Sequence, residues 1–377
     1  MIMKILHFAC YYYPHVGGIE QVAQDVVNAI GDTNEQRIIC FNHEKSDKID
    51  SVDNIKIVRA GCFAKVASQQ ISFSFKKLLK QQFEEYNPDV LIFHYPNPFA
   101  AHYVLKLLKK HKECKLVLYW HLDITKQKII GKLFNGQNKR LLKRADKVVA
   151  TSPNYVKGSS FLSAFENKCI VIPNCVNLER LTATSDDIKK AEQIRQQNAG
   201  KTLCFAIGRH VPYKGIEYLV RASKHLNDNF KIIIGGEGPL TESLKKLAEG
   251  DAKVEFIGKV DNSSLRAHLL ACDIFCFPSI TKNEAFGIAL AEAMSYAKPA
   301  VTFTIAGSGV NYVSIDGETG IEVENGNAEK YAHAIETLSV DDSLRQKLGT
   351  AAKNRVDELF TEEIFKMNIK NLIDGLI

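Results

Sequence analysis

The sequence predicts an α/β protein made of two tandem, Rossmann-like, doubly wound domains that face each other across a cleft. The chain has 377 residues, beyond the length at which one hydrophobic core usually splits in two. Short apolar runs alternate with helix-forming segments, a pattern typical of a parallel sheet covered on both faces. The alternation starts at Lys4 and restarts at Thr202, so we expect one sheet in each half.

The first half contains short apolar runs that we interpret as buried strands. They are Lys4–Ala9, Gln36–Phe41, Ile55–Arg59, Asp89–His94, Lys115–Trp120, Lys147–Ala150 and Cys169–Ile172. Helices are predicted at about Ile19–Ile30 and Phe73–Tyr86.

The second half repeats this alternation after a polar helix at Asp186–Gln197. Its predicted strands are Thr202–Ile207, Phe230–Ile234, Lys253–Ile257, Asp273–Phe277, Ala300–Thr302 and Gly320–Val323. Its other predicted helices include Gly215–His225, Leu240–Glu249 and Ser264–Cys272. We therefore expect an N-terminal domain at 1–175, a C-terminal domain at 176–360, and a last helix at 361–377 that could cross back to the N-terminal domain.

The stretch Ser279–Pro299 predicts a helix that carries two carboxylates. Its alanines favour helix, Asn283 suits an N-cap, and Lys298 with the following proline suits a stop. On such a helix Glu284 and Glu292 lie about 12 Å apart along the axis and roughly 80° apart around it. That separation is too large for a shared proton, but it suits two carboxylates that bind separate hydroxyls of one elongated ligand. An ordinary solvated helix with two exposed acids is the alternative.

The net charge of +6 is unevenly distributed. Residues 1–175 contain 25 Lys and Arg against 15 Asp and Glu, whereas the remainder contains 24 against 28. The excess is densest at Lys106, Lys109, Lys110, Lys112 and Lys115, and again at Lys126, Lys128, Lys132, Lys139, Arg140, Lys143, Arg144 and Lys147. Basic segments of this kind dock on anionic membrane surfaces, and a merely solvated face explains them as well. Nucleic acid is not expected as a partner, because no recognition motif accompanies the charge.

The chain contains no apolar run of 18 residues or more, so no spanning helix is expected. We interpret MIMKILHFAC as a first strand and not as a signal peptide. The nine cysteines include no paired CxxC, and most lie in apolar runs, which indicates free thiols in a reducing cytoplasm. Cys272 and Cys276 lack a second pair of ligands, so a zinc site is not expected.

Two loops that follow predicted strands carry residues suited to phosphate. Arg209 and Lys214 lie in GRHVPYKG, where the loop turns into a helix whose N-terminus favours anions. Two cations there would neutralise a diphosphate whose charge grows as it leaves; a pair of surface cations is the alternative. Gly17 and Gly18 lie at the first strand-to-helix turn, where backbone N–H groups can approach an anion or simply form a tight turn.

The next two loops of the second half suit the rest of a nucleotide. Gly236 and Gly238 of GGEGP allow close backbone approach to a nucleotide or ribose, although a tight turn explains them equally well. The segment FIGKVDN, with Ile257 and Val260, could hold a base by backbone hydrogen bonds and apolar stacking.

Histidines end two strands of the first half. His121 follows KLVLYW at the strand end that would face the cleft, where a polar role is favoured over a core one. His94 has the same placement after DVLIF and a weaker claim. The sequence lacks GxxxxGK[ST], GxSxG, HExxH and an Asp-x-Asp clamp after a strand, which argues against a P-loop NTPase, a serine hydrolase, a zincin and a metal-dependent sugar-nucleotide site.

Taken in order, these pieces resemble glycosyltransferase family 4, the retaining enzymes of GT-B fold. The matching pieces cover nearly the whole chain: the Gly-Gly loop, WHLD, VIPNCVN, GRHVPYKG, GGEGP, FIGKV and TKNEAFGIALAEAMSYAKPAV. Two positions depart from the family pattern, because Cys175 stands where Gly is frequent and Asn177 stands where Asp is frequent.

The resemblance implies a role for each matched residue. Glu284 would bind hydroxyls of the donor sugar, and Glu292 the ribose. Arg209 and Lys214 would bind the diphosphate without a metal or any cofactor, and His121 would face the donor sugar near the reaction centre. The other residues assigned to the nucleotide-sugar site are Gly17, Gly18, Gly236, Gly238, Ile257, Val260, Phe286, Gly287 and Ile288. The family's mechanism is a front-face attack in which the departing phosphate takes the acceptor's proton, so no protein base is required.

A narrower resemblance concerns HYPNPFA, HLDITKQK, ATSPNY and GSGVNYVS, which resemble bacterial transferases that build O-antigen or capsular polysaccharide. It implies mannosyl transfer from GDP-mannose to a lipid-linked saccharide by a cytoplasmic enzyme that is peripheral on the inner face of the membrane. A UDP-sugar donor, with glucose or an N-acetylhexosamine, is the alternative. A sugar-nucleotide epimerase, a glycogen synthase-like polymerase and a non-catalytic nucleotide-binding protein are further alternatives on the same fold.

Overall fold

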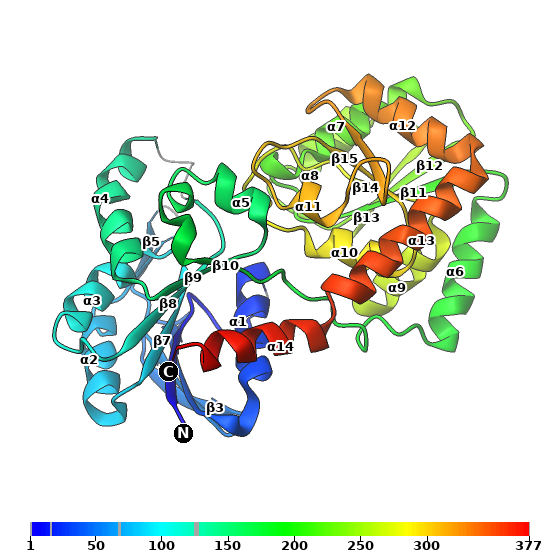
Figure 1. Cartoon of the computed structure of the whole chain (residues 1–377). Helices are drawn as coiled ribbons and strands as arrows, with labels where there is room; N and C mark the ends of the chain where they lie inside the picture. Colours follow the sequence, from blue (N-terminus) through cyan, green and yellow to red (C-terminus); the bar gives the residue numbers. More distant parts are fainter. Residues whose placement is uncertain (1, 16, 67–68, 124–127, 377) are drawn as a thin grey trace. The chain divides into compact units, whose positions relative to one another are not determined.

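The computed structural model describes residues 2–15, 17–66, 69–123 and 128–376, and it divides into two compact units (Figure 1). The N-terminal unit comprises Met1–Pro173 together with Phe365–Ile377, and the C-terminal unit comprises Asn174–Ile364. Each unit is built around its own largely parallel sheet, so the chain is an α/β protein with two Rossmann-like halves.

The N-terminal unit contains an eight-stranded sheet in the order β10-β9-β8-β7-β1-β2-β4-β3. Its strands are β1 (Lys4–Phe8), β2 (Glu35–Phe41), β3 (Lys48–Val52), β4 (Ile55–Ala60), β7 (Val90–Tyr95), β8 (Lys115–Trp120), β9 (Lys147–Ala150) and β10 (Cys169–Val171). Neighbouring strands are parallel, except that β3 runs antiparallel to β4. The central strands β1, β7 and β8 are almost entirely buried, which follows from helices on both faces of the sheet.

Helices flank this sheet on both sides, with α2, α3 and α4 on one side and α1 on the other (Figure 1). Their bounds are α1 (Gly18–Ile30), α2 (Phe75–Tyr86), α3 (Pro98–Leu108), α4 (Lys128–Arg144) and α5 (Pro153–Gly158), with 3-10 turns η1 (Gly31–Thr33) and η2 (Leu162–Lys168) and a hairpin of β5 (Ala64–Val66) with β6 (Gln69–Ile71). Local sequence sets the start of α3, because the Asn97 side chain accepts a hydrogen bond from the Ala100 backbone N–H at 2.8 Å and a proline follows. The last helix, α14 (Glu362–Asp374), groups with this unit from Phe365 onward.

The C-terminal unit contains a six-stranded, all-parallel sheet in the order β13-β12-β11-β14-β15-β16. Its strands are β11 (Thr202–Ile207), β12 (Phe230–Gly235), β13 (Val254–Gly258), β14 (Ile274–Phe277), β15 (Ala300–Phe303) and β16 (Gly320–Val323). Its helices are α6 (Ser185–Gln197), α7 (Ile216–Ala222), α8 (Thr241–Leu247), α9 (Asn262–Ala271), α10 (Ile288–Ser295), α11 (Val310–Val313), α12 (Ala328–Val340) and α13 (Asp342–Leu359), with 3-10 turns η3 (Pro212–Lys214) and η4 (Ser223–His225). The first strand of the unit therefore lies at the centre of its sheet, as in the classic dinucleotide-binding order.

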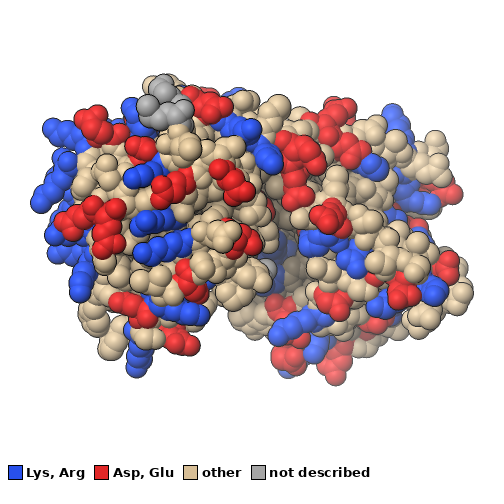
Figure 2. Space-filling view, turned by 90° about the horizontal axis from the view of Figure 1, so that it is seen from below, with Lys and Arg blue, Asp and Glu red and all other residues tan. Residues whose placement is uncertain are grey.

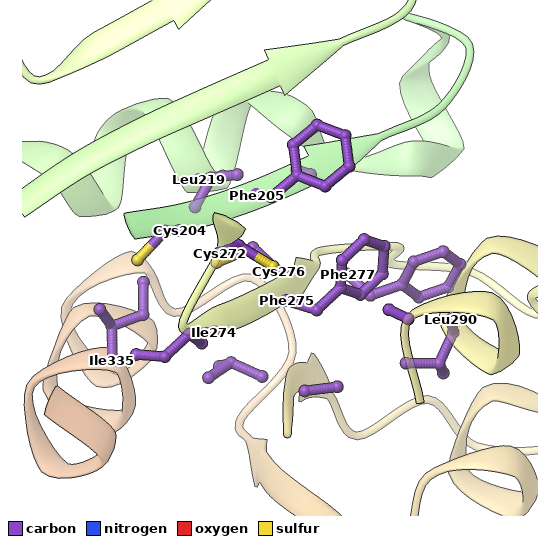
Figure 3. Packing of buried hydrophobic residues seen from close by; sticks show 14 of the residues in the cluster. Cys204, Phe205, Leu219, Cys272, Ile274, Phe275, Cys276, Phe277, Leu290 and Ile335 are labelled. Carbon is purple, nitrogen blue, oxygen red and sulfur yellow. The ribbon is translucent and has the colours of Figure 1, made fainter. Parts of the chain in front are cut away.

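The core of the C-terminal unit surrounds β11 and β14 (Figure 3). Phe205 of β11 and Phe275 of β14 lie with ring centroids 6.1 Å apart, and both are fully buried. Helices contribute the buried side chains Leu219 of α7, Leu290 of α10 and Ile335 of α12. Each large apolar side chain buried in this way contributes about 1.5–3 kcal/mol, so the strands that position the loops are firmly held. All nine cysteines of the chain are free thiols.

The predicted helix over Ser279–Pro299 is wrong in its first half. The helix α10 begins at Ile288, and its N-cap is Gly287 in a left-handed conformation with φ +95°. Residues before it form a loop, so Asn283 is not an N-cap and Glu284 does not lie on the helix. The loop is set by tertiary packing, because a Cβ atom at Gly309 would lie only 1.9 Å from the backbone oxygen of Ala285. Local helix propensity yields to this backbone contact.

The strand β3 and the hairpin of β5 with β6 were not predicted from the sequence. The sequence of β3 is KIDSV, and its residues are exposed or half-buried, so it lacks the apolar pattern of a strand. Its pairing with β4 through backbone hydrogen bonds at the sheet edge decides its conformation.

Candidate active site

The strand order of the C-terminal unit places two loops at the position where doubly wound sheets bind ligands. The central strand β11 has β12 on one side and β14 on the other, so the order reverses between β11 and β14. The crevice outside the carboxyl ends of such strands is the usual ligand site. The loop after β11 carries Lys214, and the loop after β14 carries Glu284.

Lys214 and Glu284 form an ion pair that joins these two loops. Lys214 Nζ lies 2.5 Å from Glu284 Oε2, and the two side chains are 15% and 12% exposed. The buried Ser279 hydroxyl donates to the same carboxylate oxygen at 3.1 Å. Ser308 Oγ donates to the backbone oxygen of Glu284 at 2.5 Å, which fixes the loop from the β15 side. The helix α10 does not include Glu284, yet the structure brings Glu284 and Lys214, both predicted to bind the ligand, into contact.

Close backbone packing at this edge requires glycine at two positions. Gly215 has φ +61°, and a Cβ atom there would lie 2.1 Å from the backbone oxygen of Pro278. Gly236 has φ +108°, and a Cβ atom there would lie 2.0 Å from the backbone oxygen of Gly208. The loops that follow β11, β12 and β14 are therefore in backbone contact, which leaves Gly236 beside the predicted phosphate loop.

His210 joins the two glycine-rich loops and was not predicted as part of the site. Its Nδ1 lies 2.9 Å from Thr241 Oγ1, and that hydroxyl also accepts a hydrogen bond from the Gly238 backbone N–H at 2.9 Å. Burial lowers the pKa of His210, so the imidazole is neutral at physiological pH. Its neighbour Arg209 is exposed and forms no ion pair with any described residue, so its guanidinium is available to an anion.

The predicted base-binding residues lie at the end of β13. Ile257 and Val260 are half-buried, and both approach Gly235 at the end of the neighbouring strand. Their side chains and backbone thus line the same edge as Gly236.

The predicted residues around the start of α10 differ in what they can offer a ligand. The Phe286 ring is 2% exposed and meets the Phe360 ring edge-on, with 5.3 Å between centroids. Its side chain therefore belongs to the core, and only its backbone is left for a ligand. Gly287 and Ile288 follow it at the helix start, where Ile288 is half-buried.

Glu292 lies on α10 and is paired with Arg180, a residue that sequence reasoning missed. Arg180 Nη2 donates to Glu292 Oε1, and its Nη1 donates to Asn262 Oδ1 at 2.9 Å. Burial raises the pKa of the Glu292 carboxyl, and the guanidinium of Arg180 partly offsets that rise. Arg180 is the only basic residue between Asn174 and Asp186, which is the signal that could have identified it.

In the N-terminal unit, Gly17 and Gly18 begin α1 at the end of the loop after β1. Gly17 is the N-cap in an extended conformation, and Gly18 is the first helical residue. A Cβ atom at Gly17 would lie 2.3 Å from Glu20 Oε2, so this carboxylate covers the turn. An anion that approaches these backbone N–H groups would have to displace it.

His121 and His94 form a buried pair in the N-terminal unit. His94 Nδ1 lies 3.0 Å from His121 Nε2, and the residues are 0% and 5% exposed. Burial lowers the pKa of His121 to about 3 and the pKa of His94 well below its usual range. His94, which the sequence supported less strongly as a site residue, thus contacts His121 directly.

Asp123 holds the loop that carries His121. Its carboxylate accepts hydrogen bonds from Trp120 Nε1 at 2.9 Å and from Ser159 Oγ at 2.8 Å. Its backbone N–H donates to the Tyr155 hydroxyl at 2.6 Å. The motif WHLD is therefore tied to α5, which limits how far His121 can move.

Many basic residues of the N-terminal unit are exposed, although Arg59 is buried and paired with Asp50. Figure 2 shows many Lys and Arg side chains over this unit, interspersed with Asp and Glu. Helices α3 and α4 are in contact, and their exposed cations are Lys106, Lys109, Lys110 and Lys112 at the end of α3, and Lys139, Arg140 and Lys143 on α4. Lys126 and the side chains of Lys128 and Lys132 lie outside the described residues. Lys115 and Arg144 pair with Asp146, at 3.6 Å and 3.0 Å.

Two other features are absent from the residues that the structure describes. No three His, Cys, Asp or Glu side chains of these ranges lie together as a metal centre would need. No helix within the same ranges is both long and apolar enough to cross a membrane.

Two family profiles match consecutive parts of the chain. The family described as "Glycosyltransferase Family 4" matches residues 16–180, and the family described as "Glycosyl transferases group 1" matches residues 187–355. Together the matches cover most of the chain, and each falls largely within one structural unit.

Similar proteins extend over almost the full length. The chain is 27% identical to O-antigen chain mannosyltransferase C of Escherichia coli, over 96% of this chain and 95% of that protein. It is 29% identical to D-rhamnosyltransferase WbpZ of Pseudomonas aeruginosa, over 95% of this chain and 92% of that protein. Among solved structures, Anabaena Alr3699/HepE in complex with UDP-glucose superposes with a TM-score of 0.77 at 17% identity, over 99% of this chain and 100% of that chain. At this identity the likeness concerns the fold alone.

Proposed function

The chain is a family 4-type glycosyltransferase with the GT-B fold, and on that premise we propose that it transfers mannose from GDP-mannose to a lipid-linked saccharide. We further propose that transfer retains the anomeric configuration and serves the synthesis of a surface polysaccharide, O-antigen or capsule. The name of one relative, O-antigen chain mannosyltransferase C, supports both the sugar and the product. The name of the other, D-rhamnosyltransferase WbpZ, supports glycosyl transfer but of a different sugar.

The observation that carries the proposal is the ion pair of Lys214 with Glu284 at the strand-order reversal. A donor diphosphate is a better partner for Lys214 than a carboxylate, because it brings more negative charge. In this proposal the diphosphate displaces Glu284 from Lys214, and the freed carboxylate accepts hydrogen bonds from hydroxyls of the donor sugar. Phosphate binding and sugar binding are therefore coupled through one exchange of partners.

The leaving group is stabilised by the chain's own cations in this proposal. Lys214 and the exposed Arg209 supply positive charge to the departing diphosphate, so no metal is needed. The departing phosphate takes the acceptor's proton in a front-face attack, and His121 faces the donor sugar. A protein base is not required for this reaction.

The nucleoside would lie along the edge from β13 to α10. Ile257 and Val260 line the base side, and Glu292 binds the ribose hydroxyls. Arg180 opposes the effect of burial and so favours the ionised form of Glu292, which can only accept hydrogen bonds. Two ribose hydroxyls are donors that match such an acceptor.

A UDP-sugar donor is the second candidate, because the same fold holds UDP-glucose in the solved HepE complex. Thermal denaturation with GDP and UDP, each at the same concentration, separates the two. A rise in melting temperature with GDP and none with UDP supports the mannose proposal. A rise with UDP and none with GDP would instead support a UDP-sugar donor. If no nucleoside diphosphate raises the melting temperature, the proposed sugar-nucleotide site is wrong.

The partner exchange at Lys214 has its own test. Glu284→Gln removes the competing charge but keeps the shape, so the nucleoside diphosphate should bind about five- to tenfold more tightly than to the unaltered chain. Isothermal titration measures this affinity, with Glu324→Gln, an exposed loop acid paired with a lysine, as the control. Weaker binding by Glu284→Gln would show that the carboxylate does not compete with phosphate.

The acceptor side is proposed to dock at an anionic membrane surface. The exposed cations on α3 and α4 supply the attraction, and a lipid-linked saccharide presents its diphosphate at such a surface. The saccharide would then reach the N-terminal unit, while the C-terminal unit holds the donor.

A further inference from the structure

His94 and His121 lie on one face of the N-terminal sheet. His94 of β7 is paired in register with Tyr119 of β8, and His121 follows Tyr119 by two residues. Side chains two residues apart on a strand point to the same face, and register partners do so as well. The three rings are accordingly stacked, with centroids 5.2 Å apart for His94–Tyr119, 5.1 Å for Tyr119–His121 and 5.2 Å for His94–His121.

One hydrogen joins the two imidazoles. The separation of 3.0 Å between His94 Nδ1 and His121 Nε2 is that of a hydrogen bond. Both rings are neutral because burial disfavours their charged forms. A neutral imidazole has one donor nitrogen and one acceptor nitrogen, so one ring donates and the other accepts.

The free nitrogen of His94 decides the direction of this bond. His94 Nε2 is buried and has no hydrogen-bond partner among the described residues. If that atom carried the ring hydrogen, a donor N–H would be buried without an acceptor, which is rare in proteins; an unfilled acceptor is tolerated more often. The hydrogen of His94 therefore lies on Nδ1, and His94 donates to His121 Nε2.

We propose that His94 is a positioning residue that fixes the tautomer of His121, so that His121 presents its Nδ1–H as a hydrogen-bond donor. Nδ1 of His121 forms no hydrogen bond to a described residue, which leaves it for a ligand. The ligand class is a polar oxygen of the sugar-nucleotide, a sugar hydroxyl or a phosphate oxygen, and this identity rests on the proposed function. His94 itself is fully buried and acts through His121.

The hydrogen bond from His94 stabilises the Nδ1–H tautomer of His121 before the reaction begins. A histidine without a fixed partner samples both tautomers, and only one of them offers Nδ1–H to the ligand. With His94 as donor and the loop held by Asp123, both the ring orientation and the hydrogen position are set before the sugar-nucleotide binds.

Two variants separate positioning from packing. His94→Asn keeps an amide N–H near the position of the Nδ1–H, and His94→Leu keeps comparable bulk without a donor. The free, full-length protein labelled with ¹⁵N in histidine rings is measured by long-range ¹H–¹⁵N correlation, and His121→Gln identifies the resonances of His121. We expect Nδ1 of His121 to be protonated in the unaltered chain and in His94→Asn, and both tautomers to appear in His94→Leu. Turnover with the accepted donor should fall about tenfold or more in His94→Leu, with little change in KM, and should recover in His94→Asn.

Two results would overturn the proposal. One is an unaltered chain whose His121 carries its hydrogen on Nε2, a result that needs no variant of His94 and so holds even where His94→Leu fails to fold. The other is a folded His94→Leu that keeps the tautomer and the turnover of the unaltered chain. If no sugar-nucleotide supports transfer, the proposed function fails, and the spectra of the free protein still decide the tautomer.

Discussion

The paired polar side chains of the two units differ in charge. In the C-terminal unit, Lys214 with Glu284 and Arg180 with Glu292 are ionised pairs that keep partial access to solvent. In the N-terminal unit, His94 and His121 are neutral, almost completely buried and joined by one hydrogen bond. The first edge carries strong charges close together, whereas the second carries none on its central pair.

Because of this difference, we expect the two units to contribute to ligand recognition in different ways. An ion pair near solvent can exchange one partner for a charged ligand, because the ligand replaces the lost Coulomb attraction. A buried neutral pair has no such exchange available, and its hydrogen bond instead fixes direction and tautomer. We therefore expect the C-terminal unit to recognise the charge of the donor, and the N-terminal pair to contribute geometry.

The largest expected effect comes from removing the sugar-binding carboxylate. Glu284→Ala should lower transfer by about 1,000-fold, because the ligand loses a charged acceptor at the proposed reaction site. The melting temperature should change little, since Glu284 lies in a loop and not within a helix. Initial rates and circular dichroism measure both quantities, with Glu324→Ala as the control. Wild-type turnover in Glu284→Ala would remove this residue from the site.

A smaller loss is expected from the cation of the same pair. Lys214→Ala should raise the donor KM and lower turnover together, by about 100-fold in kcat/KM, because the diphosphate is bound and stabilised as it leaves by this charge. Steady-state kinetics with varied donor measures the split, and Lys330→Ala removes a lysine from a comparable but more exposed ion pair as the control. An unchanged kcat with a raised KM would limit Lys214 to ground-state binding.

The second ion pair predicts a pH effect. Burial raises the pKa of Glu292 and Arg180 opposes the rise, so Arg180→Gln should raise this pKa further. As the pH is lowered, the carboxylate is then protonated at a higher pH than in the unaltered chain. Donor binding is therefore lost at a higher pH. The acid limb of kcat/KM for the donor should move to higher pH by about one unit, and Arg180→Lys should restore part of it. A limb that stays in place would contradict the role of Arg180.

The smallest effect on turnover is expected at the exposed basic surface. Lys109→Glu combined with Lys110→Glu and Lys112→Glu should leave transfer to a soluble acceptor within about twofold, because these side chains precede the start of β8, whereas His121 follows its end. Flotation with anionic vesicles should weaken strongly in this variant, and in the unaltered chain as salt increases. Vesicle binding that does not respond to salt would contradict an electrostatic attachment.

The strands were the most predictable part of the fold. β8, β9, β11 and β16 have the predicted bounds, because short apolar runs between polar segments have few alternatives in a buried parallel sheet. The loop that carries Glu284 was not predictable, because its conformation depends on Gly309, which follows it by 25 residues in the chain. The core position of Phe286 was likewise hidden, since an aromatic residue beside a glycine suits a ligand site as well as a core.

By itself, the sequence determined two doubly wound halves and the loops in which polar groups follow buried strands. Periodicity and glycine placement are local properties, so they can be recognised in the sequence without knowledge of tertiary contacts. Only the tertiary structure decided which of these groups are partners: Lys214 with Glu284, Glu292 with Arg180, and His121 with His94. The physical reason is that ion pairing, burial and tautomer depend on pairs of groups that are distant in the chain, and only the packing of the fold, strand order included, brings those groups together.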